Sequence, residues 1–127
     1  MKLSQLQFIG KKLRPIELQL FLKWLLHLKR KQIKLVDGTI YDIDPISDLG
    51  LKLAQHGIYE PVMGGKLEAL LVEGDCFIDL GANEGYFTVL AAKLVTPKGQ
   101  VVAVEPQERR WSVIKKNVML NGLGNVR

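Results

Sequence analysis

A glycine-rich turn between an apolar segment and a helical pattern constrains the fold of this chain more than any other feature. Residues 76–80, CFIDL, lead into the loop GANEG at residues 81–85, and apolar residues then recur at helical spacing from Tyr86 to about Val95. Glycine lets the backbone turn sharply and approach a ligand, and a helix N-terminus offers free N–H groups to an anion. We therefore predict a strand, a tight loop and a helix in succession.

A second strand and helix follow the first pair. Residues 100–104 form another apolar run, residues 108–120 have a helical pattern that ends at Asn121-Gly122, and Asn125-Val126 indicates the start of a third strand. This order is typical of a parallel sheet with right-handed crossovers, and continuous apolar strands suit a sheet covered on both faces. We expect an α/β fold in which a parallel sheet is flanked by helices.

The preceding residues have a different pattern. IKLV and TIYDI lie on either side of Asp37-Gly38 and predict a β-hairpin with strands at 33–36 and 39–43. We expect a helix over residues 48–56 and a second from about Glu60-Pro61 towards Gly74.

The positive charge is concentrated before the hairpin. The 127 residues carry a net charge of +5, yet residues 1–34 contain nine Lys or Arg and one acid, so this segment is at +8 and the rest at −3. We predict a basic amphipathic helical leader over residues 1–32, with its helix from Pro15 to about Lys31, before a second unit over residues 33–127. The leader could contact an anionic membrane surface peripherally; the interpretation we favour packs its apolar face on the domain and leaves its charges in solvent.

Other residue types exclude several classes of protein. A single cysteine, Cys76, forms no internal disulfide and is interpreted as a small core residue, which favours a cytoplasmic location. No Cys or His cluster has metal-site spacing, and the aromatic interleaving of single-strand binders is missing, so we expect no metal and no nucleic acid. Asn117, Asn121 and Asn125 recur every four residues, and we interpret them as a helix cap and solvated turns.

Two carboxylates stand at the ends of the two predicted parallel strands. Asp79 lies at the end of the first, and Glu105 follows the second, twenty residues after Gly85, where doubly wound folds place an acid that binds a ribose. A ligand with a ribose, an amino group and a carboxylate fits this set, as S-adenosylmethionine does. NAD fits less well, because Asn83 and Tyr86 stand at the third and sixth loop positions, where dinucleotide loops have glycine.

Three motifs together resemble a known family. The segments GIYEP at 57–61, FIDLGANEGYFTVLAAKLVTPKGQVVAVEP at 77–106 and IKKNVMLNGLGNV at 114–126 are similar to the N-terminal half of FkbM-type methyltransferases, class I enzymes that use S-adenosylmethionine. The resemblance covers roughly residues 33–127 and implies a partial Rossmann-like methyltransferase fold. It also implies methylation, expected on a hydroxyl of a small molecule or saccharide.

The resemblance assigns roles to particular residues. Asp79 would hold the methionine amino group, the loop would lie against the methionine and ribose, and Glu105 would bind the ribose. Pro106 and Gln107 would border the adenine, and Tyr59 and Glu60 would close over the cofactor. The cofactor-binding residues that we predict are Tyr59, Glu60, Asp79, Gly81, Ala82, Asn83, Gly85, Tyr86, Glu105, Pro106 and Gln107.

The acceptor side of the site is not assigned. A seven-stranded sheet needs about 200 residues at roughly 30 per strand-and-helix unit, so we expect this chain to be the cofactor-binding half, weakly active or inactive alone. No general base or acceptor pocket is assigned. Two alternatives stay open, a nucleotide-binding module without catalysis and a basic adaptor at a membrane surface.

Overall fold

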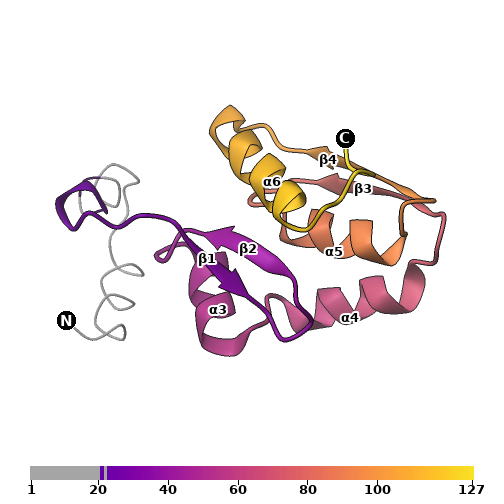
Figure 1. Cartoon of the computed structure of the whole chain (residues 1–127), viewed down its shortest axis with the longest axis horizontal. Coiled ribbons are helices and arrows are strands. Elements are labelled where there is room, and N and C mark those ends of the chain that lie inside the picture. The colour runs from indigo at the N-terminus through magenta and orange to yellow at the C-terminus, as the bar shows by residue number, and fades with distance from the viewer. Residues whose placement is uncertain (1–20, 22) are drawn as a thin grey trace.

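The computed structural model describes Phe21 and residues 23–127, which form two strand pairs and the helices packed on them (Figure 1). No helix in this part of the chain is long and apolar enough to cross a membrane. The strands are β1 (Lys31–Lys34), β2 (Ile40–Ile43), β3 (Cys76–Leu80) and β4 (Gln100–Val104), and the helices are α3 (Asp48–His56), α4 (Pro61–Leu70), α5 (Tyr86–Leu94) and α6 (Glu108–Leu120).

The second half of the chain is a parallel strand–helix unit, as predicted. β3 pairs with β4 in parallel, with Asp79 opposite Ala103. Next to β4, the amide of Arg127 donates to the carbonyl of Val101 over 2.8 Å, and Val101 and Val126 form a parallel bridge. The predicted α/β fold is therefore confirmed, and at the predicted start of a third strand the described residues form one isolated parallel bridge beside β4. A core of Ala91, Ala92, Val95 and Val101 joins α5 to β4.

The hairpin is also present, with a first strand that lies two residues earlier than predicted. Lys31 pairs with Ile43 and Lys34 with Ile40. Leu35 is outside the strand because its amide donates to the carbonyl of Thr39 over 2.8 Å and closes the turn, in which Gly38 has a φ of +85°. The buried side chains Tyr41, Ile43, Leu49 and Leu53 form a second core with Val89 of α5.

Helices α3 and α4, which lie between β2 and β3 in the sequence, begin and end at recognisable signals. The Ser47 hydroxyl accepts the Gly50 amide at the start of α3, and Gly57 ends that helix in the left-handed region. Pro61 occupies the first turn of α4. This helix ends at Leu70, before the predicted Gly74, because Leu71 is extended.

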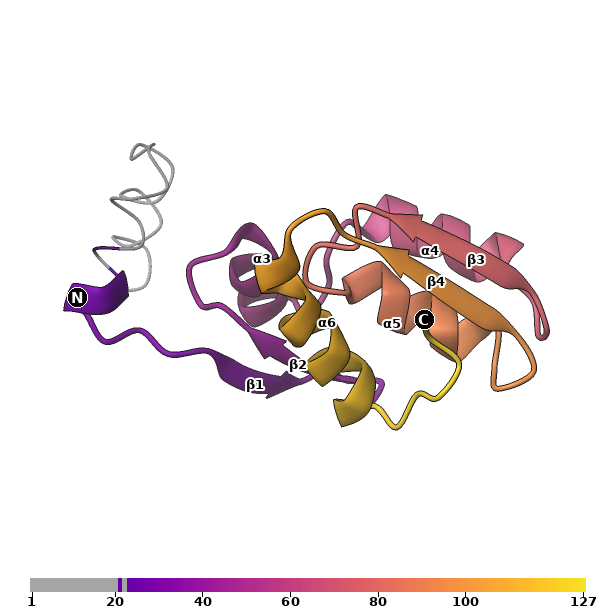
Figure 2. The same ribbon diagram turned by 90° about the horizontal axis from the view of Figure 1, so that it is seen from above.

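Helix α6 holds the two units together (Figure 2). It packs on β2, where Asn121 exchanges hydrogen bonds with the backbone of Ile40, over 2.9 Å as acceptor and 2.7 Å as donor. The side-chain oxygen of Asn117 accepts the Asp42 amide over 2.7 Å. The side chains of Asn117 and Asn121 thus satisfy backbone groups on the edge of β2 that is not paired with β1. The interpretation of Asn117 as part of a solvated turn is therefore wrong, since its side chain is fully buried.

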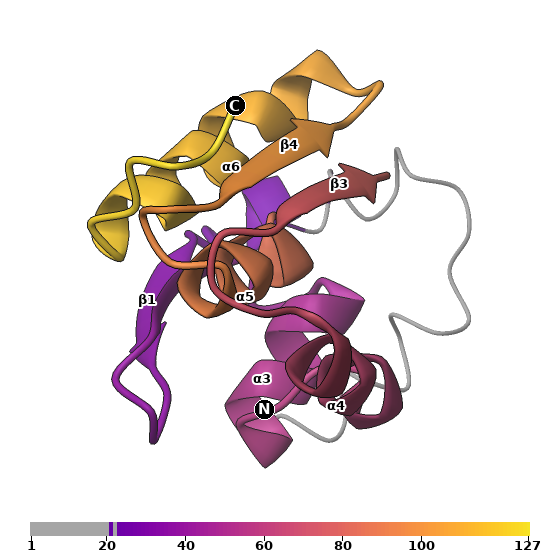
Figure 3. The ribbon, with the colours of Figure 1, turned by 90° about the vertical axis from the view of Figure 1, so that its right-hand side faces the viewer.

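Strand β3 is covered on one face only within the described residues. In Figure 3 helix α5 lies beneath β3 and β4, and the side chains of Ile78 and Leu80 on β3 are 57% and 78% exposed. Cys76 is exposed as well, so its interpretation as a core residue is wrong. The apolar sequence of β3 suggested that both faces of the strand are buried. In the structure every second residue, from Cys76 to Leu80, faces away from the helices and is exposed.

The predicted basic leader falls mostly outside the described residues. Residues 23–25 are helical, residues 26–27 form a turn, and Lys31 is already in β1, so the helix does not continue to Lys31. The division at residue 32 stays a prediction. The interpretation of the charges as solvated is wrong for Lys23, which pairs with Asp44, and for Arg30, which pairs with Asp42 and Glu84.

Candidate functional site

A small cavity opens where β3 ends and the glycine loop begins. Its volume is about 100 Å³. The loop supplies one wall, α5 and the segment before α4 supply aromatic side chains, and α3 adds one leucine. The lining residues are Leu49, Tyr59, Asp79, Gly81, Ala82, Asn83, Glu84, Tyr86 and Phe87. Six of the residues predicted to bind a cofactor are in this lining. Five come from β3, the loop and the start of α5, namely Asp79, Gly81, Ala82, Asn83 and Tyr86. The sixth, Tyr59, comes from the segment before α4.

The loop has a tightly constrained backbone. Gly81 and Gly85 have φ values of +85°, and Asn83, which is not glycine, has a φ of +54°. The amides of Gly81 and Ala82 both donate to the carbonyl of Val104, over 2.8 and 3.0 Å. A side chain at Gly81 would meet no atom within 4 Å, so its bare backbone faces open space. The loop is thus tied to the end of β4 and open on its other side.

Gly85 has a different role from Gly81. A Cβ atom there would lie 3.4 Å from Ile114 of α6, in van der Waals contact with it. Glycine therefore permits both the positive φ and the close packing of the loop against α6. Tyr86, which lines the cavity, follows Gly85 directly and begins α5.

Asp79 is a buried carboxylate at the floor of the cavity. It is 8% exposed, and its Oδ2 accepts a hydrogen bond from the Thr88 hydroxyl over 2.6 Å. Burial raises the pKa of Asp79, and the nearby Glu105 carboxylate raises it further, while the hydrogen bond from Thr88 opposes both. A cation at this point of the cavity would relieve the cost of burying the charge.

Glu105 holds the loop from the next strand. Its Oε1 accepts the amide of Gln107 over 2.9 Å, and its Oε2 accepts the amide of Asn83 over 2.8 Å. The Gln107 amide lowers the pKa of Glu105, and the Asn83 amide lowers it too, against the opposing effect of desolvation. Each carboxylate oxygen has a second lone pair, so Glu105 can still accept hydrogen bonds from a ligand.

An aromatic cluster forms the side wall. Tyr86 stacks on Tyr41 with ring centroids 5.3 Å apart, and Tyr59 meets Tyr86 edge-on at 5.5 Å. The Tyr86 hydroxyl accepts the backbone amide of Tyr59 over 3.4 Å, which links this wall to the segment before α4. These contacts place Tyr59 beside the loop although it lies more than twenty residues earlier in the sequence.

Other predicted site residues lie outside the cavity lining. Glu60 pairs with Lys52 over 2.9 Å, on the exposed side of the segment. Pro106 and Gln107 are exposed beyond the end of β4, where the side-chain oxygen of Gln107 accepts hydrogen bonds from Arg109 and Arg110. Their roles in binding stay predictions.

The sequence reasoning missed four residues of the site. Leu49 and Phe87 line the cavity, Glu84 lines it from within the loop, and Thr88 donates to Asp79. Glu84 and Thr88 carried a usable signal in the sequence, because Glu84 lies within the glycine loop and Thr88 three residues beyond it. Leu49 carried none, since only the packing of the hairpin unit on α5 brings α3 to the loop.

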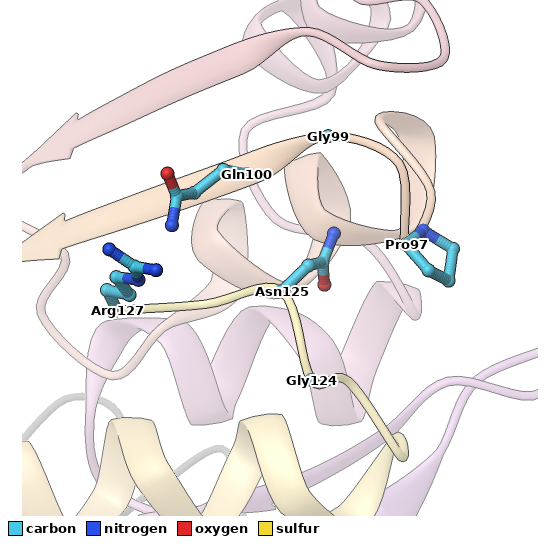
Figure 4. A pocket seen from close by; sticks show the side chains of 6 residues that line it. All are labelled: Pro97, Gly99, Gln100, Gly124, Asn125 and Arg127. Carbon is cyan, nitrogen blue, oxygen red and sulfur yellow. The ribbon is translucent and has the colours of Figure 1, made fainter.

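A larger cavity lies at the other end of the sheet (Figure 4). Its volume is about 410 Å³, and its lining includes Pro97, Gln100, Asn125 and Arg127. Asn125 is already engaged there, since its side-chain nitrogen donates to the carbonyls of Ala92 and Thr96. Ligands of open α/β sheets bind at the carboxyl ends of the strands, so the smaller cavity at the loop is the candidate site.

Several solved structures have a fold similar to that of this chain. No model of a protein family matches the chain, and no curated protein matches it. Among solved structures, M. jannaschii TYW2 in complex with AdoMet (S-adenosylmethionine) is 24% identical with a TM-score of 0.57, over 78% of this chain and 42% of that one. A SAM-dependent O-methyltransferase from Thermotoga maritima is 24% identical with a TM-score of 0.51, over 78% of this chain and 39% of that one.

These likenesses define the class of fold. The chain has the Rossmann-like fold of class I methyltransferases, with a small parallel sheet flanked by helices, which confirms the predicted fold class. It spans about two fifths of the length of the methyltransferase structures that it matches. The FkbM subtype, the cytoplasmic location and membrane contact stay predictions.

Proposed function

We propose that this chain binds S-adenosylmethionine at the loop of residues 81–85 and takes part in methyl transfer as an FkbM-type methyltransferase. The observation that carries the proposal is the convergence of Asp79 and Glu105 on one glycine loop. Asp79 ends β3, Glu105 follows β4, and the loop amide of Asn83 donates to Glu105 over 2.8 Å. Two carboxylates and an open backbone therefore meet at the carboxyl ends of two adjacent parallel strands.

The residues present fit such a ligand. The Asn83 side-chain oxygen is buried without a hydrogen-bond partner, and Gly81 leaves its Cβ position open. Asp79 would hold the amino group, which relieves its buried charge, while Glu105 would accept the ribose hydroxyls. The loop and the aromatic wall of Tyr59 and Tyr86 would exclude water around the bound molecule. When bound, S-adenosylmethionine supplies an electrophilic methyl group on a sulfonium.

For the acceptor we propose a hydroxyl of a small molecule or saccharide. The support is the resemblance of residues 57–61, 77–106 and 114–126 to FkbM-type enzymes, together with the O-methyltransferase likeness of the fold. Methyl transfer to an alcohol requires alignment of the acceptor oxygen with the methyl group, and a base that takes its proton. We expect those groups in the part of the methyltransferase fold that lies outside the two fifths that this chain matches.

Titration calorimetry tests cofactor binding directly. We expect the chain to bind S-adenosylhomocysteine and adenosine, and NAD more weakly than either. Glu105→Gln should weaken binding of the first two by roughly 10- to 150-fold, because hydrogen bonds to a charged group are worth about 1.5–3 kcal/mol. Glu108→Gln is the matched control, because Glu108 lies in the first turn of α6 and is exposed. Equal affinities of Glu105→Gln and the natural chain would refute the proposed ribose contact.

A second variant separates the two ends of the ligand. Asp79→Asn should weaken S-adenosylhomocysteine binding and leave adenosine binding unchanged, because adenosine has no amino acid portion. If Asp79→Asn weakened both ligands equally, Asp79 would have a structural role instead. Transfer of a radiolabelled methyl group to saccharide acceptors, with the chain alone and with the remaining strands supplied, then distinguishes an enzyme from a nucleotide-binding module without catalysis.

A further inference from the structure

A side chain from outside the predicted methyltransferase segment reaches the glycine loop. Arg30, just before β1, donates from its terminal Nη2 to the Glu84 carboxylate over 2.5 Å. Its Nε donates to the Asp42 carboxylate over 2.7 Å, and Nη2 also donates to the Asp42 carbonyl over 2.6 Å. Arg30 thus joins β2 to the loop through three hydrogen bonds.

Glu84 is the point at which the loop is held. Its side chain is 9% exposed, so Arg30 compensates a buried charge, and removal of Arg30 would leave that charge unpaired. The backbone carbonyl of Glu84 accepts the side-chain amide of Asn117 over 2.7 Å. One loop residue is therefore fixed through its side chain and through its backbone, from opposite ends of the sequence.

Asp42 is hydrogen-bonded to both Arg30 and Asn117, the two side chains that bind Glu84. Its carboxylate, 4% exposed, accepts hydrogen bonds from Arg30 and from Lys116 of α6, and its backbone amide donates to Asn117. Burial by itself would raise the pKa of Asp42, and the hydrogen bonds from Lys116 and Arg30 outweigh it and lower that pKa. Asp42 stays ionised at neutral pH and keeps Arg30 oriented towards the loop.

The loop requires such support because its conformation is strained. Gly81, Asn83 and Gly85 all have positive φ values, and a left-handed non-glycine residue persists only where its surroundings fix it. Glu84 directly follows Asn83, so a contact at Glu84 acts next to the strained residue. Lys116 is the natural comparison, because it also pairs with Asp42, over 2.9 Å, while among the described residues it makes no hydrogen bond or ion pair with Glu84.

We propose that Arg30 is a positioning residue that holds residues 81–85, through Glu84, in the conformation that lines the cavity. Ligand affinity then depends on a residue that is not part of the lining. The effect on affinity rests on the proposed function, whereas the effect on the loop does not.

Amide hydrogen exchange in the ligand-free chain tests the loop. The reporters are the Asn83 amide, which donates to Glu105, and the Gly85 amide, which donates to the Ala82 carbonyl over 2.7 Å. Arg30→Met should accelerate exchange of both by at least about tenfold relative to the amides between β3 and β4. Arg30→Lys should restore part of the protection, and Lys116→Met should change it less than threefold. Equal acceleration in the loop and the sheet would overturn the proposal, as would no change.

Calorimetry with S-adenosylhomocysteine tests the consequence for binding. Arg30→Met should weaken binding about tenfold in the natural chain and less than threefold in a Glu84→Gln background, because the partner is then already neutral. A tenfold loss in both backgrounds would refute action through Glu84. If the natural chain does not bind this ligand, the proposed function fails, and the exchange of Asn83 and Gly85 still decides the role of Arg30.

Discussion

The parallel unit, residues 76–120, and the hairpin unit, residues 30–56, contribute to the candidate site in different ways. In the parallel unit the chain direction itself brings the predicted ligand-binding groups together, since Asp79 is the last residue but one of β3, and the loop and Glu105 directly follow β3 and β4. The hairpin unit contributes one lining residue, Leu49, and otherwise supports the site from behind. One unit carries the groups that would bind a ligand, and the other fixes their positions.

The two units also differ in how their cores are closed. The parallel unit has its own cluster of small apolar residues between α5 and β4. The hairpin is a two-stranded ribbon, which is marginal in water by itself, and its core is completed by Val89 of α5. The hairpin unit therefore depends on the parallel unit for its folding, and the loop in turn depends on the hairpin unit for its shape.

The largest effect should come from removing the side chain that joins the units. Asn117→Ala leaves the Asp42 amide and the Glu84 carbonyl without partners in a fully buried place. We expect the free energy of unfolding to fall by about 2–6 kcal/mol, because two buried groups lose their partner and each costs about 1–3 kcal/mol. Urea denaturation measures this loss.

Asn121→Ala is the matched control for that variant. Asn121 also bonds β2, at Ile40, but it is only half-buried, so water can reach the groups it leaves. A loss of about 1 kcal/mol is expected. Equal losses for both variants would show that the link to the loop adds nothing to the attachment of β2.

Asp79→Asn should separate ligand binding from stability within the parallel unit. Affinity for S-adenosylhomocysteine should fall by roughly 10- to 150-fold, from the loss of hydrogen bonds worth about 1.5–3 kcal/mol. The variant should nevertheless unfold at a higher urea concentration at pH 7. Burial raises the pKa of Asp79, so the protonated form is favoured by folding, and its stabilisation is lost as pH rises through the folded pKa.

The stability gain should shrink as the pH is lowered. Below the ordinary pKa of an aspartate, Asp79 is protonated in the folded and unfolded states alike and costs nothing by its charge. Denaturation curves of both proteins at several pH values check this sign. A variant less stable than the natural chain at pH 7 would contradict the burial cost assigned to Asp79.

The sequence was informative where backbone geometry determines the site. The bounds of β3, β4, α3 and α6 agree with those predicted, and Asp79 and Glu105 lie at adjacent strand ends because parallel strands end at one edge. Arg30 and Asn117 could not be assigned in advance, because their partners are 54 and 33 residues away. The asparagine spacing was visible, yet only the packing of β2 on α6 shows that Asn117 is buried.

Two glycines with the same conformation allow the ligand site to be compared with a turn of the hairpin. Gly81 and Gly38 both have a φ of +85° and open space around the Cβ position. Gly81→Ala and Gly38→Ala should each lower the free energy of unfolding by about 1–2 kcal/mol, the cost of a left-handed alanine. Only Gly81→Ala should weaken binding of S-adenosylhomocysteine, since its methyl group would enter the open space in which we propose that the ligand binds. Calorimetry on both variants checks this, and equal affinities would place the ligand elsewhere.

The smallest effect concerns the exposed contact between the units. Lys93 of α5 pairs with Asp37 in the hairpin turn over 2.7 Å, and the Asp37 side chain is 57% exposed. Burial alone would raise the pKa of Asp37, but hydrogen bonds from Lys93 and Thr39 outweigh it and lower that pKa to about 2. Because solvent screens the pair, Lys93→Met should cost less than about 1 kcal/mol at pH 7.

The loss of stability in Lys93→Met should depend on pH, because the Asp37 carboxylate titrates. A lowered folded pKa gives stability that is present above the ordinary pKa of 3.8 and is lost as pH falls through about 2. The difference between Lys93→Met and the natural chain should therefore diminish between pH 5 and pH 2. Lys98→Met, which removes an exposed pair with Glu73 just before the parallel unit, is the control for loss of one surface lysine. If both variants lost the same stability at every pH, the Lys93–Asp37 pair would add nothing to the contact between the units.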